Sequence, residues 1–411
     1  MAVEANLTIR FSGMNFHPSD VHNFGRYVQK MNVDGTVFYR KPRPIQVELF
    51  LFGRESPLKK ILSQQGDEKH VALLSSLFVL DGKVETHEGD WCAGCGRMVE
   101  IERITQEAFG VELRDPEALK VRVRKYGSLL GYAFALGIRD LNYENIIHSP
   151  TGVHLIDAEV VFEAIPFVSL TEGMGSDLVS KLGSGMLSFW FMLNRLTDSS
   201  GAALTSFDLS FPSDLLESLL SGFFDMLDLI QKACVLLEDS VDVFLRGQGE
   251  VPIRFIIRPT SHYGDYLSKG VAPEIPLIEA EIAQLKRGDI PYFYSTPIDK
   301  TVRYLTSASG SSEAIQVPPG HPLNAVFRLV ERYSVKTLLS PQRLQKIRAM
   351  GAIELFRELR ESSLSRVEYA RTIMVEREGK IIYQYEDELH SGPMASGEAD
   401  HFPLNFQIMK V

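Results

Sequence analysis

Cysteine and long hydrophobic runs are scarce in this sequence. Its 411 residues include three cysteines, Cys92, Cys95 and Cys234, which are too few for a disulfide framework and typical of a reducing environment. No run of about 18 uncharged apolar residues occurs. The first residues, MAVEANLTIRFSGMNF, lack the apolar core and the cleavage site of a secretory signal. We therefore expect a cytoplasmic protein.

Positive charge is also in deficit. Lysine and arginine number 43 against 53 aspartate and glutamate residues, so the net charge is −10. A surface of that sign does not attract nucleic acid or anionic membrane as a whole, and we expect neither as a partner. The chain is 45% apolar, so it can bury a large core, and its length favours two lobes or domains.

The segment RYVQKMNVDGTVFYRKPRP predicts a β-hairpin. Two runs rich in β-branched and aromatic residues flank Asp34-Gly35, a two-residue turn signal. The second strand would end at Lys41, before a proline that stops further pairing. A polar loop with Gly25 precedes the hairpin, and a glycine there lets backbone approach a ligand closely.

A helix and a polar segment follow further along the chain. The helix is predicted from Asp115, which can cap it, to Gly137, which is placed to end it. The segment RDLNYENIIHSPTGVHLIDAEVVF then brings Asp140 and Asn145 in a loop and Asp157 inside an apolar, strand-like run. As structural residues, all three would be turn formers. A buried Asp157 without a partner would be costly, which favours a bound ligand.

These residues match the parts that phosphoryl transfer from ATP requires: a lysine for the phosphates, oxygen ligands for Mg²⁺ and an acid for the accepting hydroxyl. Asp140 would orient or deprotonate that hydroxyl. Asn145 and Asp157 would hold Mg²⁺, which prefers oxygen ligands. Three residues in or next to the hairpin would contact the nucleotide: Gly25, Lys41 and Arg43.

Four segments resemble, in order, the signatures of the dehydratase domain of class II lanthipeptide synthetases. They read DVHNFGRYVQKMNVDGTVFYRKPR, GYAFALGIRDLNYENIIHSPTGVHLIDAEVVF, RFIIRPTSHYGDYL and RGDIPYF. The resemblance implies an α+β, lipid-kinase-like fold, with a small β-rich N-lobe over residues 1–112 and a mostly helical C-lobe over 113–411. It also implies an activity. Such domains use ATP and Mg²⁺ to phosphorylate serine and threonine of a precursor peptide, and they then eliminate the phosphate to leave dehydroalanine or dehydrobutyrine.

The resemblance assigns roles to further residues. Asp20 and His22 match the family's loop acid and histidine, and Arg254 and Thr260 match positions that support phosphate elimination. Arginine suits that step, because its planar fork can stabilise a departing phosphate. Without the resemblance, Arg254 and Arg258 would be interpreted as solvated charges on an exposed strand face.

Two positions depart from the family pattern. Asn142 stands where the family has a catalytic-loop histidine, and Ser19 stands where it has a glycine. Asparagine can form hydrogen bonds but does not exchange protons near neutral pH as histidine does. We therefore expect phosphorylation to tolerate the change better than elimination does.

The residues after Phe293 contain no cysteine, so the zinc cyclase of a full synthetase is not expected among them. The hypothesis is a stand-alone dehydratase that acts on a precursor peptide with a leader and works beside a separate cyclase. Two alternatives stay open. One is a kinase that stops after phosphate transfer to a peptide, protein or small molecule, and the other is a nucleotide-binding pseudoenzyme that serves as a scaffold.

A second motif, HEGDWCAGCGRM, resembles part of a zinc site. It offers His87, Cys92 and Cys95, but structural zinc needs four ligands and no second cysteine pair follows. A turn with two reduced thiols is therefore favoured over a metal site. His148 and His154 flank a Ser-Pro turn and are predicted to face solvent.

Overall fold

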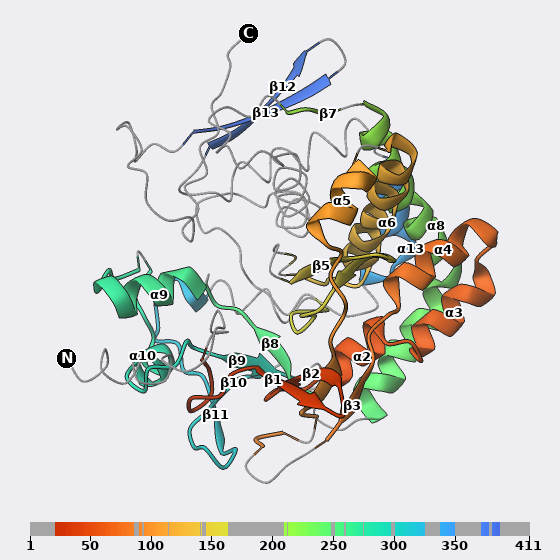
Figure 1. Ribbon diagram of the computed structural model, residues 1–411. Helices are drawn as coiled ribbons and strands as arrows, with labels where there is room; N and C mark the ends of the chain where they lie inside the picture. Colours follow the sequence, from red (N-terminus) through yellow and green to blue (C-terminus); the bar gives the residue numbers. More distant parts are fainter. Residues whose placement is uncertain are drawn as a thin grey trace.

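The computed structural model describes residues 21–85, 90–92, 94–113, 115–139, 141, 145–162, 209–211, 213–247, 251–258, 260–273, 275–296, 301–324, 338–349, 371–377 and 380–386. Within these residues the chain has a mixed α+β structure with nine helices and antiparallel sheets (Figure 1). The α+β class predicted from the sequence is confirmed. No helix in the part described is long and apolar enough to cross a membrane.

The described helices range from seven residues in the shortest to 35 residues in the longest. They are α2 (Gln46–Phe52), α3 (Pro57–Gln65), α4 (Glu68–Leu77), α5 (Gln106–Leu113), α6 (Pro116–Ala135), α8 (Ser213–Gly247), α9 (Thr260–Lys269), α10 (Glu279–Leu285) and α13 (Pro341–Ala349).

The strands form four sheets. The first has the order β1-β2-β4-β3, with β1 (Gln29–Val33), β2 (Thr36–Lys41), β3 (Gly82–Val84) and β4 (Gly96–Val99). The second has the order β11-β10-β9-β8, with β8 (Ile253–Phe255), β9 (Phe293–Ser295), β10 (Val302–Leu305) and β11 (Ser312–Ala314). A two-stranded hairpin pairs β5 (Ile146–Ser149) with β6 (Gly152–Leu155), and the third sheet pairs β13 (Lys380–Glu386) with β12 (Arg371–Arg377) and β7 (Leu209–Phe211).

The predicted hairpin is confirmed as β1 and β2. Val33 lies opposite Thr36, so Asp34 and Gly35 alone make the turn. Their φ angles are 51° and 83°, and a two-residue turn of this kind requires φ above zero at both positions. Lys41 is the last residue of β2, as the sequence indicated.

Helix α6 begins and ends where the sequence predicted. The carboxylate of Asp115 accepts hydrogen bonds from the N–H groups of Glu117, at 3.0 Å, and Ala118, at 3.2 Å. At the other end Gly137 has φ 59°, and Ile138 N donates to a carbonyl of the last turn at 2.8 Å. This is the usual glycine-ended helix terminus.

Glycines let α6 and α8 pack closely against each other. A Cβ atom added to Gly127 on α6 would lie 1.9 Å from the carbonyl oxygen of Leu219 on α8. One added to Gly222 on α8 would lie 1.9 Å from the carbonyl oxygen of Arg124 on α6. Any larger residue at either position would force the two backbones apart.

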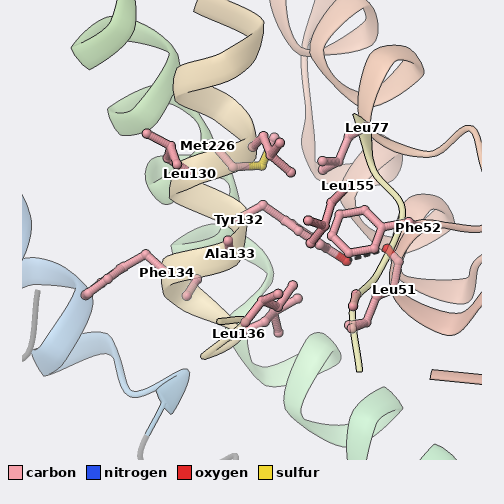
Figure 2. Close-up of a cluster of buried hydrophobic side chains, with 14 of the residues drawn as sticks. Leu51, Phe52, Leu77, Leu130, Tyr132, Ala133, Phe134, Leu136, Leu155 and Met226 are labelled. Carbon is pink, nitrogen blue, oxygen red and sulfur yellow. Dashed lines mark hydrogen bonds between the residues drawn. The ribbon is translucent and has the colours of Figure 1, made fainter. Parts of the chain in front are cut away.

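The main core surrounds the second half of α6. Figure 2 shows Tyr132 extending from α6 toward Phe52, with its hydroxyl donating a hydrogen bond to the carbonyl of Leu51 at 2.8 Å. Tyr132 is fully buried, and this bond satisfies the one polar group that its burial removes from water. The same core contains residues from both sides of residue 112, and the lobe boundary predicted there stays a prediction.

Three local predictions were wrong. Strand β6 ends at Leu155, so Asp157 follows the strand instead of lying inside it. The polar residues TSHYGDY after the strand IRFII predict a loop, but the segment after β8 forms helix α9. His154 is 1% exposed and therefore does not face solvent, and its Nδ1 donates to the carbonyl of Ser76 at 2.7 Å. His148 is half-buried.

Candidate functional site

The β5–β6 hairpin brings the two predicted metal ligands to one end. Ile146 pairs with Leu155, and the N–H of Ile156 donates to the carbonyl of Asn145 at 2.9 Å. Asn145 and Asp157 therefore flank the open end of the hairpin, where its two strands part. The side chain of Asp157 is 32% exposed, so a ligand from solvent can reach it.

Lys41 lies against the same end of the hairpin. Its ammonium group donates to the carbonyl of Ile156 and forms an ion pair with Glu48 of α2 at 2.8 Å. Glu48 is fully buried and also accepts a hydrogen bond from Ala158 N at 3.2 Å. Glu48 thus holds both the lysine and the backbone beside Asp157. The sequence offered a signal for it, since it is the one acid in the apolar helix QVELFLF.

Arg43 joins three carboxylates. Its guanidinium forms ion pairs with Asp157, with Glu48 at 2.9 Å and with Glu159 at 3.1 Å. Burial alone would lower the pKa of Arg43, but Asp157, Glu48 and Glu159 outweigh that effect and hold the pKa well above its usual value. Arg43 therefore stays charged and connects the lysine side of the site to the residues that follow β6.

Glu159 connects this cluster to Arg254 of β8. One carboxylate oxygen pairs with the Arg254 guanidinium, and the other accepts from the hydroxyl of Tyr292 at 3.3 Å. Burial by itself raises the pKa of Glu159, but Arg254 and Arg43 outweigh it and hold the pKa below its ordinary value. The sequence analysis missed Glu159, although a second acid in the apolar run DAEVVF was a signal for it.

The interpretation of Arg254 and Arg258 as exposed strand charges was wrong. Arg254 is 8% exposed and Arg258 is 5% exposed. Arg258 donates to both carboxylate oxygens of Glu281, at 2.6 and 2.9 Å, and Tyr263 donates to the same carboxylate at 2.6 Å. Arg258 thus belongs to a separate buried cluster, and only Arg254 reaches the site.

We name this cluster the site network and define it by its six charged members. Its cations are Lys41, Arg43 and Arg254, and its anions are Glu48, Asp157 and Glu159. Three positive and three negative charges cancel. Each buried charge also has at least one partner of opposite sign, which is needed because an unpaired buried charge would be strongly destabilising.

A loop at the start of the described chain has left-handed backbone conformation and is hydrogen-bonded to the segment before β9. Asn23, Phe24 and Gly25 have φ angles of 50°, 69° and 80°, and the N–H groups of Phe24 and Gly25 both donate to the carboxylate of Asp289, at 2.8 and 2.9 Å. Successive N–H groups arranged in this way bind an anion. A nucleotide contact by the Gly25 amide would have to displace the bond to Asp289.

His22 is fixed next to the site network by the same loop. Its Nδ1 lies 2.7 Å from the carbonyl oxygen of Ile290. A carbonyl only accepts, so Nδ1 carries the hydrogen and Nε2 is the acceptor in the neutral ring. Burial, followed by the charge of Arg254, lowers the pKa of His22 to about 3. His22 is therefore a neutral hydrogen-bonding group near Arg254.

The protein should lose stability on acidification through its buried histidines. Burial lowers the pKa of His22 and His148 to about 3 and of His154 to about 4, below the value of about 6.5 in an unfolded chain. The stability from their neutral forms is complete above pH 6.5 and is lost as pH falls toward these folded values, because the unfolded chain takes up the protons.

We expect the free energy of unfolding to fall by about 2 kcal/mol per buried histidine between pH 7 and pH 5, measured by urea titration. His22→Gln should remove one histidine's share of that loss, while His262→Gln on α9 serves as the control. Equal pH dependence of the wild type and His22→Gln would contradict the burial of His22.

The remaining predicted site residues are placed only in part. Asp20, Asp140 and Asn142 lie outside the described residues. The chain just before Asp140 runs beside the segment after β6, because Arg139 N donates to the carbonyl of Val160 at 2.8 Å. Thr260 is half-buried and is the first residue of α9.

The oxygen donors at the hairpin end fit a hard divalent cation. Asn145 and Asp157 offer an amide and a carboxylate oxygen, and Mg²⁺ is held by one or two such groups together with phosphates and water. Among the residues described, no three His, Cys, Asp or Glu side chains gather into a metal-type cluster. Cys92 and Cys95 lie together, and His87 falls outside the described residues.

Comparison with known proteins adds no family assignment: no protein-family model matches the chain, and no curated protein matches it at a significant level.

Proposed function

We propose that this chain is a kinase-like phosphotransferase that phosphorylates serine and threonine in a leader-bearing precursor peptide and then eliminates the phosphate. The observation that carries the proposal is the site network. It joins Lys41, Asp157 and Arg254, which come from three distant segments and were each assigned a role in phosphate chemistry from the sequence.

Phosphate transfer would use the lysine side of the site network. Lys41 is held by Glu48 with its ammonium group at the hairpin end, where it would bind the nucleotide phosphates. Asn145 and Asp157 would hold Mg²⁺, which when bound neutralises phosphate charge and aligns the transferred group. Asp140 would orient the accepting hydroxyl, a role that rests on the sequence resemblance.

Arg43 gives the site a second arrangement. Its guanidinium is paired with one oxygen of Asp157, so a cation bound by Asp157 would share that carboxylate with Arg43 or replace it. Arg43 would keep Glu48 and Glu159 as partners in either case. The part of the guanidinium that Asp157 releases could then contact the phosphates, while Glu48 and Glu159 still balance the charge of Arg43.

Elimination would use Arg254 and its neighbours. A base takes the α-proton, the bond from the β-carbon to the phosphate oxygen breaks, and the phosphate leaves with both electrons of that bond. Arg254 would stabilise the departing phosphate. The neutral His22 beside it can accept a hydrogen bond through Nε2, but its low pKa argues against a role as a cation.

One observation favours the second candidate, a kinase that stops after phosphate transfer. Arg254 is already paired with Glu159, so a phosphate would have to compete with that carboxylate. Together with asparagine at position 142, this makes elimination the step with less support.

A single assay separates these activities. The protein is incubated with ATP, Mg²⁺ and a Ser/Thr/Cys-rich precursor peptide from a neighbouring gene, and the peptide is analysed by mass spectrometry. Net loss of water supports the dehydratase, retained phosphate supports the kinase, and an unchanged peptide supports the scaffold.

Arg254→Ala should convert the dehydratase into a phosphopeptide-producing enzyme. We expect elimination to slow by at least about 10²-fold, the effect of removing one preorganised charge stabiliser, while phosphate transfer continues. Arg246→Ala on α8, whose side chain is 74% exposed, is the matched control. Dehydration at the wild-type rate in Arg254→Ala would remove the elimination role from this residue.

A further inference from the structure

The two cysteines of the motif CAGC lie next to each other between β3 and β4. The sulfur atoms of Cys92 and Cys95 are 3.0 Å apart. Cys95 is fully buried, whereas Cys92 is partly exposed. A disulfide has its sulfurs about 2.05 Å apart, so these two would need to approach by roughly 1 Å to form one.

The backbone around the pair is held tightly in place. The carbonyl of Gly94 accepts from Ile45 N at 2.8 Å, and the carbonyl of Cys95 accepts from Glu85 N at 3.0 Å. A Cβ atom on Gly94 would lie 1.7 Å from Oε1 of Gln46. The turn therefore packs directly against the first residues of α2, and the two sulfurs are kept close by the fold around them.

The turn is also connected to the strand that carries Lys41. Gly96, next to Cys95, pairs with Lys41 across β4 and β2. The indole N–H of Trp91, next to Cys92, donates to the carbonyl of Pro42 at 2.8 Å, and Pro42 lies between Lys41 and Arg43. The Gly96–Lys41 pairing and the Trp91–Pro42 hydrogen bond therefore connect this turn directly to the backbone at residues 41–43.

Trp91 extends the connection to the second sheet. Its ring centre lies 5.0 Å from that of Tyr294 and 6.2 Å from that of Tyr292, and the Tyr292 hydroxyl donates to Glu159. A movement of Trp91 would therefore change its contacts with Pro42, next to Lys41 and Arg43, and with Tyr292, which binds Glu159.

We propose that Cys92 and Cys95 are a thiol–disulfide couple whose oxidation moves Trp91 and, with it, the backbone that carries Lys41 and Arg43. This inference does not depend on the proposed function, because the couple and the Trp91 contact are properties of the turn itself. The oxidant is a small-molecule disulfide such as oxidised glutathione.

The reaction is a double exchange. The sulfur of Cys92, the more exposed residue of the pair, attacks one sulfur of the small disulfide, forms a mixed disulfide and releases one small thiol. The Cys95 sulfur then attacks Cys92 and releases the second small thiol. The two protein thiols lose two protons and two electrons, and the two small thiols that form carry both away. The sulfur of Cys95 already lies beside that of Cys92, so the second attack needs only a short approach.

The test uses the full chain equilibrated in buffers of reduced and oxidised glutathione at fixed ratios. Each sample is unfolded, alkylated and weighed by mass spectrometry, and tryptophan fluorescence is recorded before unfolding. The chain has three cysteines, so the reduced form should take three alkyl groups and the oxidised form one, at Cys234. The fluorescence should change over the same range of glutathione ratios.

Variants separate the pair from the rest of the chain. Cys92→Ser and Cys95→Ser should abolish the internal disulfide, whereas Cys234→Ser on α8 should retain it. Trp91→Phe should remove the fluorescence change, because Trp91 is the tryptophan next to the pair, and should leave the alkylation transition. The one other tryptophan of the chain then provides a constant signal. In the wild-type protein, an alkylation transition without a change in tryptophan fluorescence would overturn the link to the site network.

Two other results would overturn the couple itself. The first is three alkyl groups, or a mixed disulfide on Cys92 alone, in excess oxidised glutathione. The second is a stoichiometric zinc ion in the purified chain that is lost in Cys92→Ser, since this would identify the pair as metal ligands completed by residues outside the described part.

Discussion

Asp157→Ala should reduce phosphate transfer by at least about 10²- to 10³-fold, the scale of losing one preorganised charged group at a reacting centre. Asp157 is the one acid of the site network that is substantially exposed to solvent, at 32%, and with Asn145 it provides the oxygen atoms at the hairpin end. Its removal would leave a bound cation with one protein ligand. The measurement is the initial rate of phosphopeptide formation at saturating ATP and Mg²⁺.

The same variant should fold normally. Arg43 keeps Glu48 and Glu159 as partners after Asp157 is removed, so no buried charge is left unpaired. The free energy of unfolding should therefore change little. Asp81→Ala is the matched control, because its carboxylate is 55% exposed and lies in a surface ion pair. Phosphate transfer at the wild-type rate in Asp157→Ala would refute the metal role.

Glu159→Gln should be strongly destabilising and should also alter the chemistry at Arg254. The change keeps the shape of the side chain but removes the charge that balances Arg43 and Arg254. Breaking a buried ion pair in this way costs about 3 kcal/mol or more, which is to be measured by urea unfolding. Arg254 would also lose the carboxylate with which a phosphate has to compete, so less phosphopeptide should accumulate relative to dehydrated peptide.

Glu281→Gln distinguishes the two effects. Glu281 is also a buried acid paired with an arginine, Arg258, but it belongs to the other cluster. Its replacement should cost similar stability and leave the ratio of phosphopeptide to dehydrated peptide unchanged. The double variant Glu159→Gln with Arg254→Gln should recover part of the lost stability, because both charges are then absent. Purely additive losses would contradict a direct pair.

The local elements were predicted well because their signals lie within a few residues. Asp34-Gly35 fixes the hairpin turn, and Asp115 and Gly137 fix the ends of α6, each through backbone conformation or capping bonds. Helix α9 was missed, since its first residues, TSHYGDY, are polar and resemble a loop. Its buried Tyr263 is hydrogen-bonded to Glu281, which lies in another segment.

The grouping of the candidate site residues could be predicted in outline only. Lys41 and Asp157 stood out by motif and spacing, and the structure brings both to the hairpin end. Glu48 was missed although Lys41 and Arg43 are only seven and five residues away. Glu159 was missed because its partner lies in another segment: Glu159 and Arg254 are 95 residues apart in the chain. No local pattern specifies such a pair, although a lone acid in an apolar run is a signal that can be sought.

The segment RGDIPYF illustrates how a motif can act at a distance from the chemistry. Asp289 binds the N–H groups of Phe24 and Gly25, and the carbonyl of Ile290 orients His22. The motif therefore positions the N-terminal loop. The sequence marked both segments but gave no indication that they touch.

The charge balance of the site network has a consequence for the order of ligand binding. A magnesium ion alone would add positive charge to a neutral, partly desolvated cluster, and a nucleotide alone would add negative charge. Together they largely cancel each other's charge. Each ligand should therefore raise the affinity for the other, and the two would enter this site as a joint complex.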